Sequence, residues 1–251
     1  MSDFDRNVAA RGGFADRVAI DAGLRAYMLR VYNYMAAAVA LTGVTAWATF
    51  NAAVTTDATG HITGLTSFGQ TVFGGPLMIA LMLGTLGLVF FISFRINRLQ
   101  YTTALTLFML YAGLLGIALS SIFLTYTGAS ITRVFFISAA SFGALSIYGY
   151  TTQRDLSPIG SFLIMGLFGI IIASLVNIFL KSSGLDWAIS IIGVGVFAGL
   201  TAYDTQRIKE MYDSHDDSNT VGRKVVMGAL SLYLDFINLF MMLLRLVGDR
   251  R

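Results

Sequence analysis

The chain has 251 residues, of which 56% are hydrophobic and only 12% are charged, and its mean hydropathy is +0.72. Soluble domains carry about 25% charged residues, so a soluble chain of this composition could not cover its apolar residues with a polar exterior. The same figures exclude intrinsic disorder. A net charge of +3 without a basic cluster argues against nucleic-acid binding, and the lack of cysteines excludes disulfides and thiolate sites. We therefore predict an all-α integral membrane protein.

Seven apolar runs are long enough to cross a bilayer, since a transmembrane helix needs about 20 such residues. They are Val31–Val54, Pro76–Phe94, Thr102–Leu124, Val134–Tyr150, Ile159–Leu180, Trp187–Tyr203 and Val225–Val247. The first six runs contain no Asp, Glu, Lys or Arg, whereas the seventh contains Asp235 and Arg245. The sequence therefore predicts a seven-helix transmembrane domain over residues 28–251.

Residues 1–27 hold four Arg and four Asp, which is too balanced for the positive end of a signal peptide. We expect a soluble, partly disordered tail on the cytoplasmic side. With the N-terminus inside, twelve Lys and Arg residues lie inside and five outside, as the positive-inside rule favours. The basic end from Arg245 to Arg251 then falls outside. Either the last helix does not fully cross, or the rule fails there.

One carboxylate lies near the middle of the seventh run, where a charge costs about 2.5–3.5 kcal/mol on insertion scales. Asp235 is 11 residues from Lys224, or about 16 Å along a helix, which is close to the midplane of a bilayer. Ser231, Asn238 and Arg245 share its helix face, because the spacings are four, three and seven residues. This polar stripe should face protein and line an interior path or a partner.

A second carboxylate, Asp204, lies near the basic end of the sixth run, with Thr201 on the same helix face. Its depth depends on where the helix ends. If the membrane border is at Arg207, Asp204 is one turn inside and hydrated. If the helix continues to Tyr212, Asp204 is about 12 Å deep and could meet Asp235.

Two carboxyl groups brought together in a low dielectric cannot both stay ionised, and such a pair can share one proton. The pair would act as a pH sensor and, once deprotonated, as an oxygen-only site for a hard cation. Asp204 and Asp235 are therefore the candidate cation ligands, and no cofactor is predicted. Arg95 and Arg98 follow the second run, at its cytoplasmic end, and Asp204 lies near the cytoplasmic end of the sixth run. They are either orientation signals or a latch that reaches Asp204.

Two stretches carry a resemblance to a known family. They are Tyr203-Asp204-Thr205-Gln206 with Ile208-Lys209, and Ala229–Phe240 followed by Leu243–Leu246. In these stretches, and in its spans over about Arg25 to Gly248, the chain resembles the Bax inhibitor-1 family, also called the transmembrane Bax inhibitor motif family. The resemblance implies seven transmembrane helices, with the C-terminal helix central and the other six wrapped around it.

The resemblance also implies an activity, a pH-sensitive calcium leak gated by a hydrogen-bonded aspartate pair. By motif the pair falls on Asp204 and Asp235, and the latch arginine on Arg95 or Arg98, with Arg95 preferred. The polar residues expected to line the path are Ser231, Asn238 and Thr201. The protein would not be an enzyme, calcium would be the transported ion, and membrane lipid would surround it. The expected location is the bacterial inner membrane.

Two other functions are compatible with the sequence. Some bacterial relatives are associated with a membrane-bound quality-control protease, which favours a non-conducting partner whose function survives loss of Asp235. An intramembrane aspartyl protease would also use two aspartates to activate water. Its second motif is Gly-x-Gly-Asp, because close backbone approach needs glycine. Here that position reads Leu232-Tyr-Leu-Asp235, which argues against this enzyme.

Overall fold

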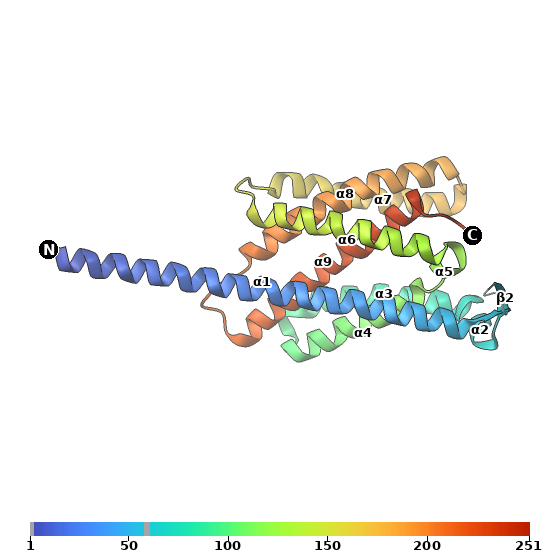
Figure 1. Ribbon diagram of the computed structural model, residues 1–251, viewed down its shortest axis with the longest axis horizontal. Helices are drawn as coiled ribbons and strands as arrows, with labels where there is room; N and C mark the ends of the chain where they lie inside the picture. The colour runs from blue at the N-terminus through green and yellow to red at the C-terminus, as the bar shows by residue number, and fades with distance from the viewer. Residues whose placement is uncertain (1–2, 58–60) are drawn as a thin grey trace.

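The computed structural model describes residues 3–57 and 61–251, with side chains described from residue 22 onward (Figure 1). Most of these residues are helical, and the two strands present among them form one short hairpin. The elements in chain order are α1 (Asp3–Ala53), β1 (Val54–Thr56), β2 (Ile62–Leu65), α2 (Ser67–Phe73), α3 (Pro76–Arg95), the 3-10 helix η1 (Ile96–Arg98), α4 (Tyr101–Leu119), α5 (Ile122–Thr125), α6 (Gly128–Thr151), α7 (Ser157–Leu180), α8 (Ser183–Glu210) and α9 (Ser218–Val247).

The prediction of seven membrane-spanning helices is confirmed. Within the described residues, seven helical segments are long and apolar enough to cross a membrane. They are Ala22–Ala53, Pro76–Arg98, Tyr101–Thr125, Gly128–Thr151, Ser157–Leu180, Ser183–Glu210 and Ser218–Val247. Most extend beyond the predicted apolar runs, because helices continue into the polar interface until a capping residue ends them. The protein is thus an all-α integral membrane protein.

The first helix is longer than the sequence suggests. α1 begins at Asp3, so its backbone is helical through most of the segment predicted as a partly disordered tail. No proline interrupts residues 3–53, and a helix that has already formed extends at little cost. In Figure 1 this end of α1 projects beyond the other helices. That residues 1–27 form a cytoplasmic tail stays a prediction.

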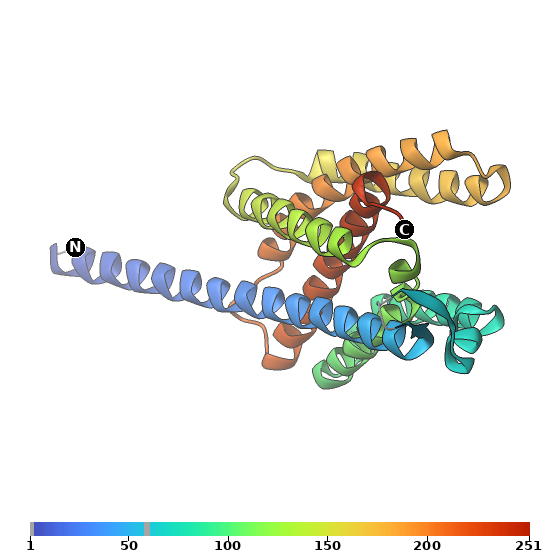
Figure 2. The same ribbon diagram turned by 45° about the vertical axis from the view of Figure 1, so that its right-hand side comes forward.

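The helices form two lobes with α9 between them (Figure 2). In the first lobe α4 packs against α1 and α3, and the β1–β2 hairpin and α2 close the end of α1. In the second lobe α8 packs against α6 and α7. The last helix contacts both lobes, through α1 and α4 on one side and α6 and α8 on the other. α9 is therefore the element that joins the two halves of the protein.

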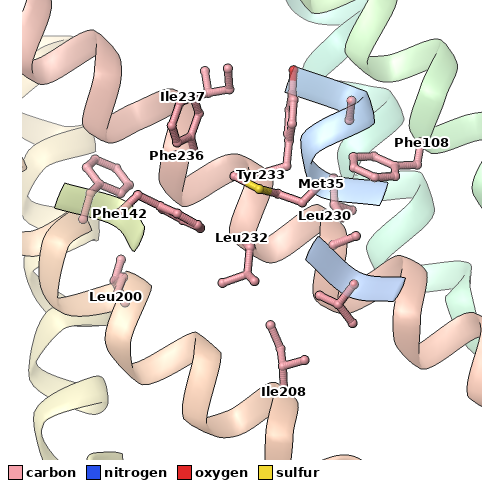
Figure 3. Close-up of a cluster of buried hydrophobic side chains, with 14 of the residues drawn as sticks. Met35, Phe108, Phe142, Leu200, Ile208, Leu230, Leu232, Tyr233, Phe236 and Ile237 are labelled. Atoms are coloured by element: carbon pink, nitrogen blue, oxygen red, sulfur yellow. The ribbon is translucent and has the colours of Figure 1, made fainter. Parts of the chain in front are cut away.

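Aromatic side chains of α9 anchor it in each lobe (Figure 3). Tyr233 meets Phe108 of the first lobe with ring centroids 5.6 Å apart, and its hydroxyl lies 2.7 Å from Oγ1 of Thr42. Phe236 meets Phe142 of the second lobe, also at 5.6 Å. In its most apolar window 72% of α9 residues are buried, against 11% for α3 and for α7. An arrangement of all six other helices around a central α9 stays a prediction.

The C-terminal end of α9 docks on the start of α6. The amide of Asp249 donates to Oγ of Ser130 at 2.8 Å, and Arg133 forms an ion pair with Asp249 at 2.8 Å. Arg245 lies 3.9 Å from Asp186 near the start of α8. The starts of α6 and α8 and the end of α9 therefore share one end of the molecule. α9 is long and apolar enough to cross a membrane, and which of the two explanations for its basic end holds depends on the side on which that end lies.

Candidate functional site: a carboxyl pair between two lobes

Asp204 and Asp235 lie on the two helices that contact each other most extensively, α8 and α9. α8 ends at Glu210, so Asp204 lies six residues before its end, about 9 Å along the helix. The helix thus continues past Arg207 and ends two residues before Tyr212, close to the longer of the two helices considered from the sequence. Asp235 is only 5% exposed, and Asp204 is half-buried.

The two carboxyl groups lie close enough to influence each other's ionisation, and both line the same cavity. Oδ2 of Asp235 is buried and has no hydrogen-bond partner within the described part of the chain. A buried carboxylate oxygen without a donor is costly, because nothing replaces the water that it lost. A proton shared with Asp204, or a bound cation, would supply the missing partner.

The pair opens into a cavity of about 630 Å³ between the two lobes. Its walls come from α3, α7, α8 and α9 and are mostly aliphatic. The polar residues that line it are Ser174, Asp204, Arg207, Ser231, Asp235 and Asn238. This volume is within the range of about 300–1,000 Å³ that is usual for ligand sites. The cavity therefore offers a polar strip within apolar walls.

Three of the four residues of the predicted stripe on the last helix face this cavity, whereas Arg245 lies near Asp186 at the start of α8. Ser231, Asp235 and Asn238 all line the cavity, and the amide of Asn238 donates to the carbonyl oxygen of Leu234 at 2.8 Å. Thr201 does not belong with them. It is fully buried, its hydroxyl donates to the carbonyl oxygen of Phe197 at 2.8 Å, and it is absent from the cavity lining. Placing Thr201 by helix face alone ignored this bond to its own backbone.

The structure does not bring either predicted latch residue to the pair. Arg95 and Arg98 are exposed at the end of α3 and in η1, and neither forms an ion pair with any described side chain. The cation that acts on Asp204 is Arg207, one turn along α8, which also lines the cavity. Asp204 and Arg207 are three residues apart on one helix, and this spacing predicts that their side chains are neighbours. A latch at Arg95 or Arg98 stays a prediction.

The oxygen donors at the carboxyl pair are few for a tightly bound metal ion. Among the described residues no group of three or more His, Cys, Asp or Glu is placed to hold a metal ion. Asp204 and Asp235 could therefore be supplemented only by neutral oxygens, such as those of Ser231 and Asn238, and by water. Calcium sites of high affinity use six to eight oxygens with several carboxylates. Two carboxylates predict weak and reversible binding.

Known proteins are similar to this chain over all the residues that form the site. The sequence profile of the family described as "Inhibitor of apoptosis-promoting Bax1" matches residues 24–251. An uncharacterized protein of Rickettsia prowazekii is 52% identical over 232 residues, which is 92% of each chain. The inner membrane protein YbhL of Escherichia coli is 47% identical over 232 residues, 92% of this chain and 94% of its own. A Caulobacter vibrioides protein is 41% identical across the whole of both chains. The chain belongs to the Bax inhibitor-1 family.

Proposed function

We propose that the protein is a pH-sensitive calcium leak of the membrane, gated by the Asp204–Asp235 pair. One observation carries the proposal: a buried carboxyl pair with an unpartnered oxygen opens into a cavity between two lobes. Ionisable groups at membrane depth are costly, and they are retained where they serve ion or proton pathways. Cations would pass along the strip formed by Ser231, Asn238 and the two carboxyl groups.

Gating would follow from the proton count of the pair. With one shared proton, the two carboxyl groups hold α8 and α9 together. Without it, two like charges about 4 Å apart repel by roughly 4 kcal/mol at an effective dielectric constant of 20. That energy is comparable to the few kcal/mol that separate conformations of many proteins. Either the helices shift or a cation enters between the carboxylates, so the leak depends on pH.

The proposed location is the bacterial inner membrane with the N-terminus in the cytoplasm. The relative from Escherichia coli is named an inner membrane protein. In Figure 1 the connections 152–156 and 211–217 lie at the end of the bundle from which the first part of α1 projects. Most of the Lys and Arg residues belong to this side. In this proposal the protein has no enzymatic activity, and calcium is its cargo.

The first test replaces Asp235 by Asn, which keeps the shape and removes the titratable group. Purified Asp235→Asn protein in calcium-loaded proteoliposomes should show a leak that no longer changes between about pH 6 and about pH 8. The control is Asp155→Asn. Asp155 is exposed between α6 and α7, and its carboxylate accepts a hydrogen bond from the amide of Ser157 at 2.8 Å.

The control should keep the pH profile of the unmodified protein. If Asp235→Asn also keeps it, Asp235 is not the sensor. If no leak exists in the unmodified protein while its cellular function survives Asp235→Asn, the protein is a non-conducting partner. In that case a membrane-bound protease is the first candidate to test by co-purification.

A further inference from the structure

The two lobes part on a second side of the molecule, between α1 and α6. Within the described residues these two helices do not pack closely against each other. A cavity of about 520 Å³ lies between them, and we call it the α1–α6 groove. Met28 and Leu29 of α1 form one wall, and Phe142, Gly143 and Ile147 of α6 form the other. The groove is lined by residues that the carboxyl pair does not involve.

The walls of the groove are open to the membrane. Leu29 is 52% exposed and Ile147 is 66% exposed, and both belong to membrane-spanning segments. A Cβ atom added at Gly143 would meet no atom within 4 Å, so the groove is open at this position. Apolar walls do not hold water well, because water finds no hydrogen-bond partners there. A hydrocarbon chain is the occupant that such walls favour.

Two cations mark one end of the groove. Arg25 lines it and is exposed, and its guanidinium forms no ion pair with any side chain described from residue 22 onward. At the same end, Nζ of Lys209 donates to the carbonyl oxygen of Tyr150 at 2.9 Å and lies 5.5 Å from the centre of its ring. Tyr150 also lines the groove. The apolar groove therefore ends in positive charge.

We propose that the α1–α6 groove binds an anionic phospholipid from the leaflet on the N-terminal side. One acyl chain would lie against Leu29, Phe142 and Ile147, and the phosphate would bind the guanidinium of Arg25. Guanidinium groups bind phosphate oxygens through two parallel hydrogen bonds. Basic sites between transmembrane helices on the cytoplasmic side are typical places for lipid headgroups.

The test uses a tryptophan reporter in the groove. Ile147→Trp is made in a Trp47→Phe/Trp187→Phe background and reconstituted into vesicles of phosphatidylcholine and phosphatidylglycerol. In matched samples only one of the two lipids carries brominated acyl chains, which quench nearby tryptophan. We expect brominated phosphatidylglycerol to quench several-fold more efficiently than brominated phosphatidylcholine at the same mole fraction. Arg25→Gln should bring this ratio to about one.

Two further variants separate the headgroup from the chain. Gly143→Phe fills the groove and should reduce quenching by both lipids. Arg30→Gln is the matched control, because the Arg30 guanidinium lies over the ring of Tyr101, 5.9 Å from its centre, outside the groove. It should leave the preference unchanged.

Three results would overturn the proposal. The first is equal quenching by the two lipids in the reporter protein. The second is the same loss of preference in Arg30→Gln as in Arg25→Gln, which would show general attraction to a basic surface. The third is a reporter shielded from both lipids in a protein that crosslinks as a dimer. That result would make a second copy of the chain the occupant.

Discussion

The position of Asp235 in an apolar helix was enough to predict where a polar strip lies. Its distance from Lys224 and its spacing from Ser231 and Asn238 predicted a polar strip near mid-membrane, and the structure places all three of these residues along one cavity. The spacing of three residues indicated that Arg207 can lie near Asp204, but the sequence could not show that Arg95 does not. The difference arises because the position of a long side chain depends on tertiary packing, which helix periodicity does not contain.

If the two aspartates form the proposed gate, we expect their effects on pH dependence to be non-additive. Two groups that share a proton titrate as one unit, so neutralising either one removes the unit. Asp204→Asn and Asp235→Asn should each abolish most of the pH response of the leak, and the double variant should lose little more. The measurement is the leak rate against pH for the four proteins at fixed calcium and membrane potential. Losses that sum across the set would show two independent sites.

At the scale of helices, hydropathy located the spans but not their surroundings. α3 and α7 have the highest mean hydropathies, 2.4 and 2.6, yet only 11% of each window is buried in protein. α9 has a mean hydropathy of 1.8 and is 72% buried. Lipid and protein interior are equally apolar, so an apolar residue does not report which of them it contacts. The polar stripe and the small residues of a helix are better indicators of a protein contact.

Gly149 illustrates such a small-residue contact between α6 and α8. A Cβ atom at this position would lie 2.2 Å from the carbonyl oxygen of Ala202, so the helices must move apart to admit it. Gly149→Ala should destabilise the folded protein by about 1–3 kcal/mol, as overpacking usually does. Gly143→Ala on the same helix is the control, because its Cβ atom meets open space. Thermal unfolding in detergent should show a lower midpoint for Gly149→Ala alone. Equal midpoints for the two variants would mean that α6 and α8 adjust freely at this crossing.

At the scale of the whole molecule, the two-lobe arrangement joined by α9 explains why the site lies where it does. Neither lobe alone buries Asp235, since its cavity is formed by α3 of the first lobe, α7 and α8 of the second, and α9 itself. Any change in the α8–α9 contact therefore changes the relation between the lobes. The sequence did not predict this division, because it follows from which apolar faces meet, and each helix has several such faces.

The arrangement also makes a firm prediction about which ends of the protein share a side of the membrane. Because the chain lacks cysteine, a single introduced thiol reports its own position. Ser183 at the start of α8 and Ser214 beyond its end are both exposed, so Ser183→Cys and Ser214→Cys should react with a membrane-impermeant maleimide from opposite sides. A cysteine added after Arg251 should react from the same side as Ser183→Cys, because Asp249 is bound to Ser130 and Arg133 at the start of α6.

The measurement compares labelling in right-side-out spheroplasts and in inverted vesicles. Ser214→Cys should be labelled from the cytoplasmic side, which would also fix the N-terminus there. If the C-terminal thiol instead reacts together with Ser214→Cys, α9 does not cross the membrane, and the docking of its end on α6 is wrong.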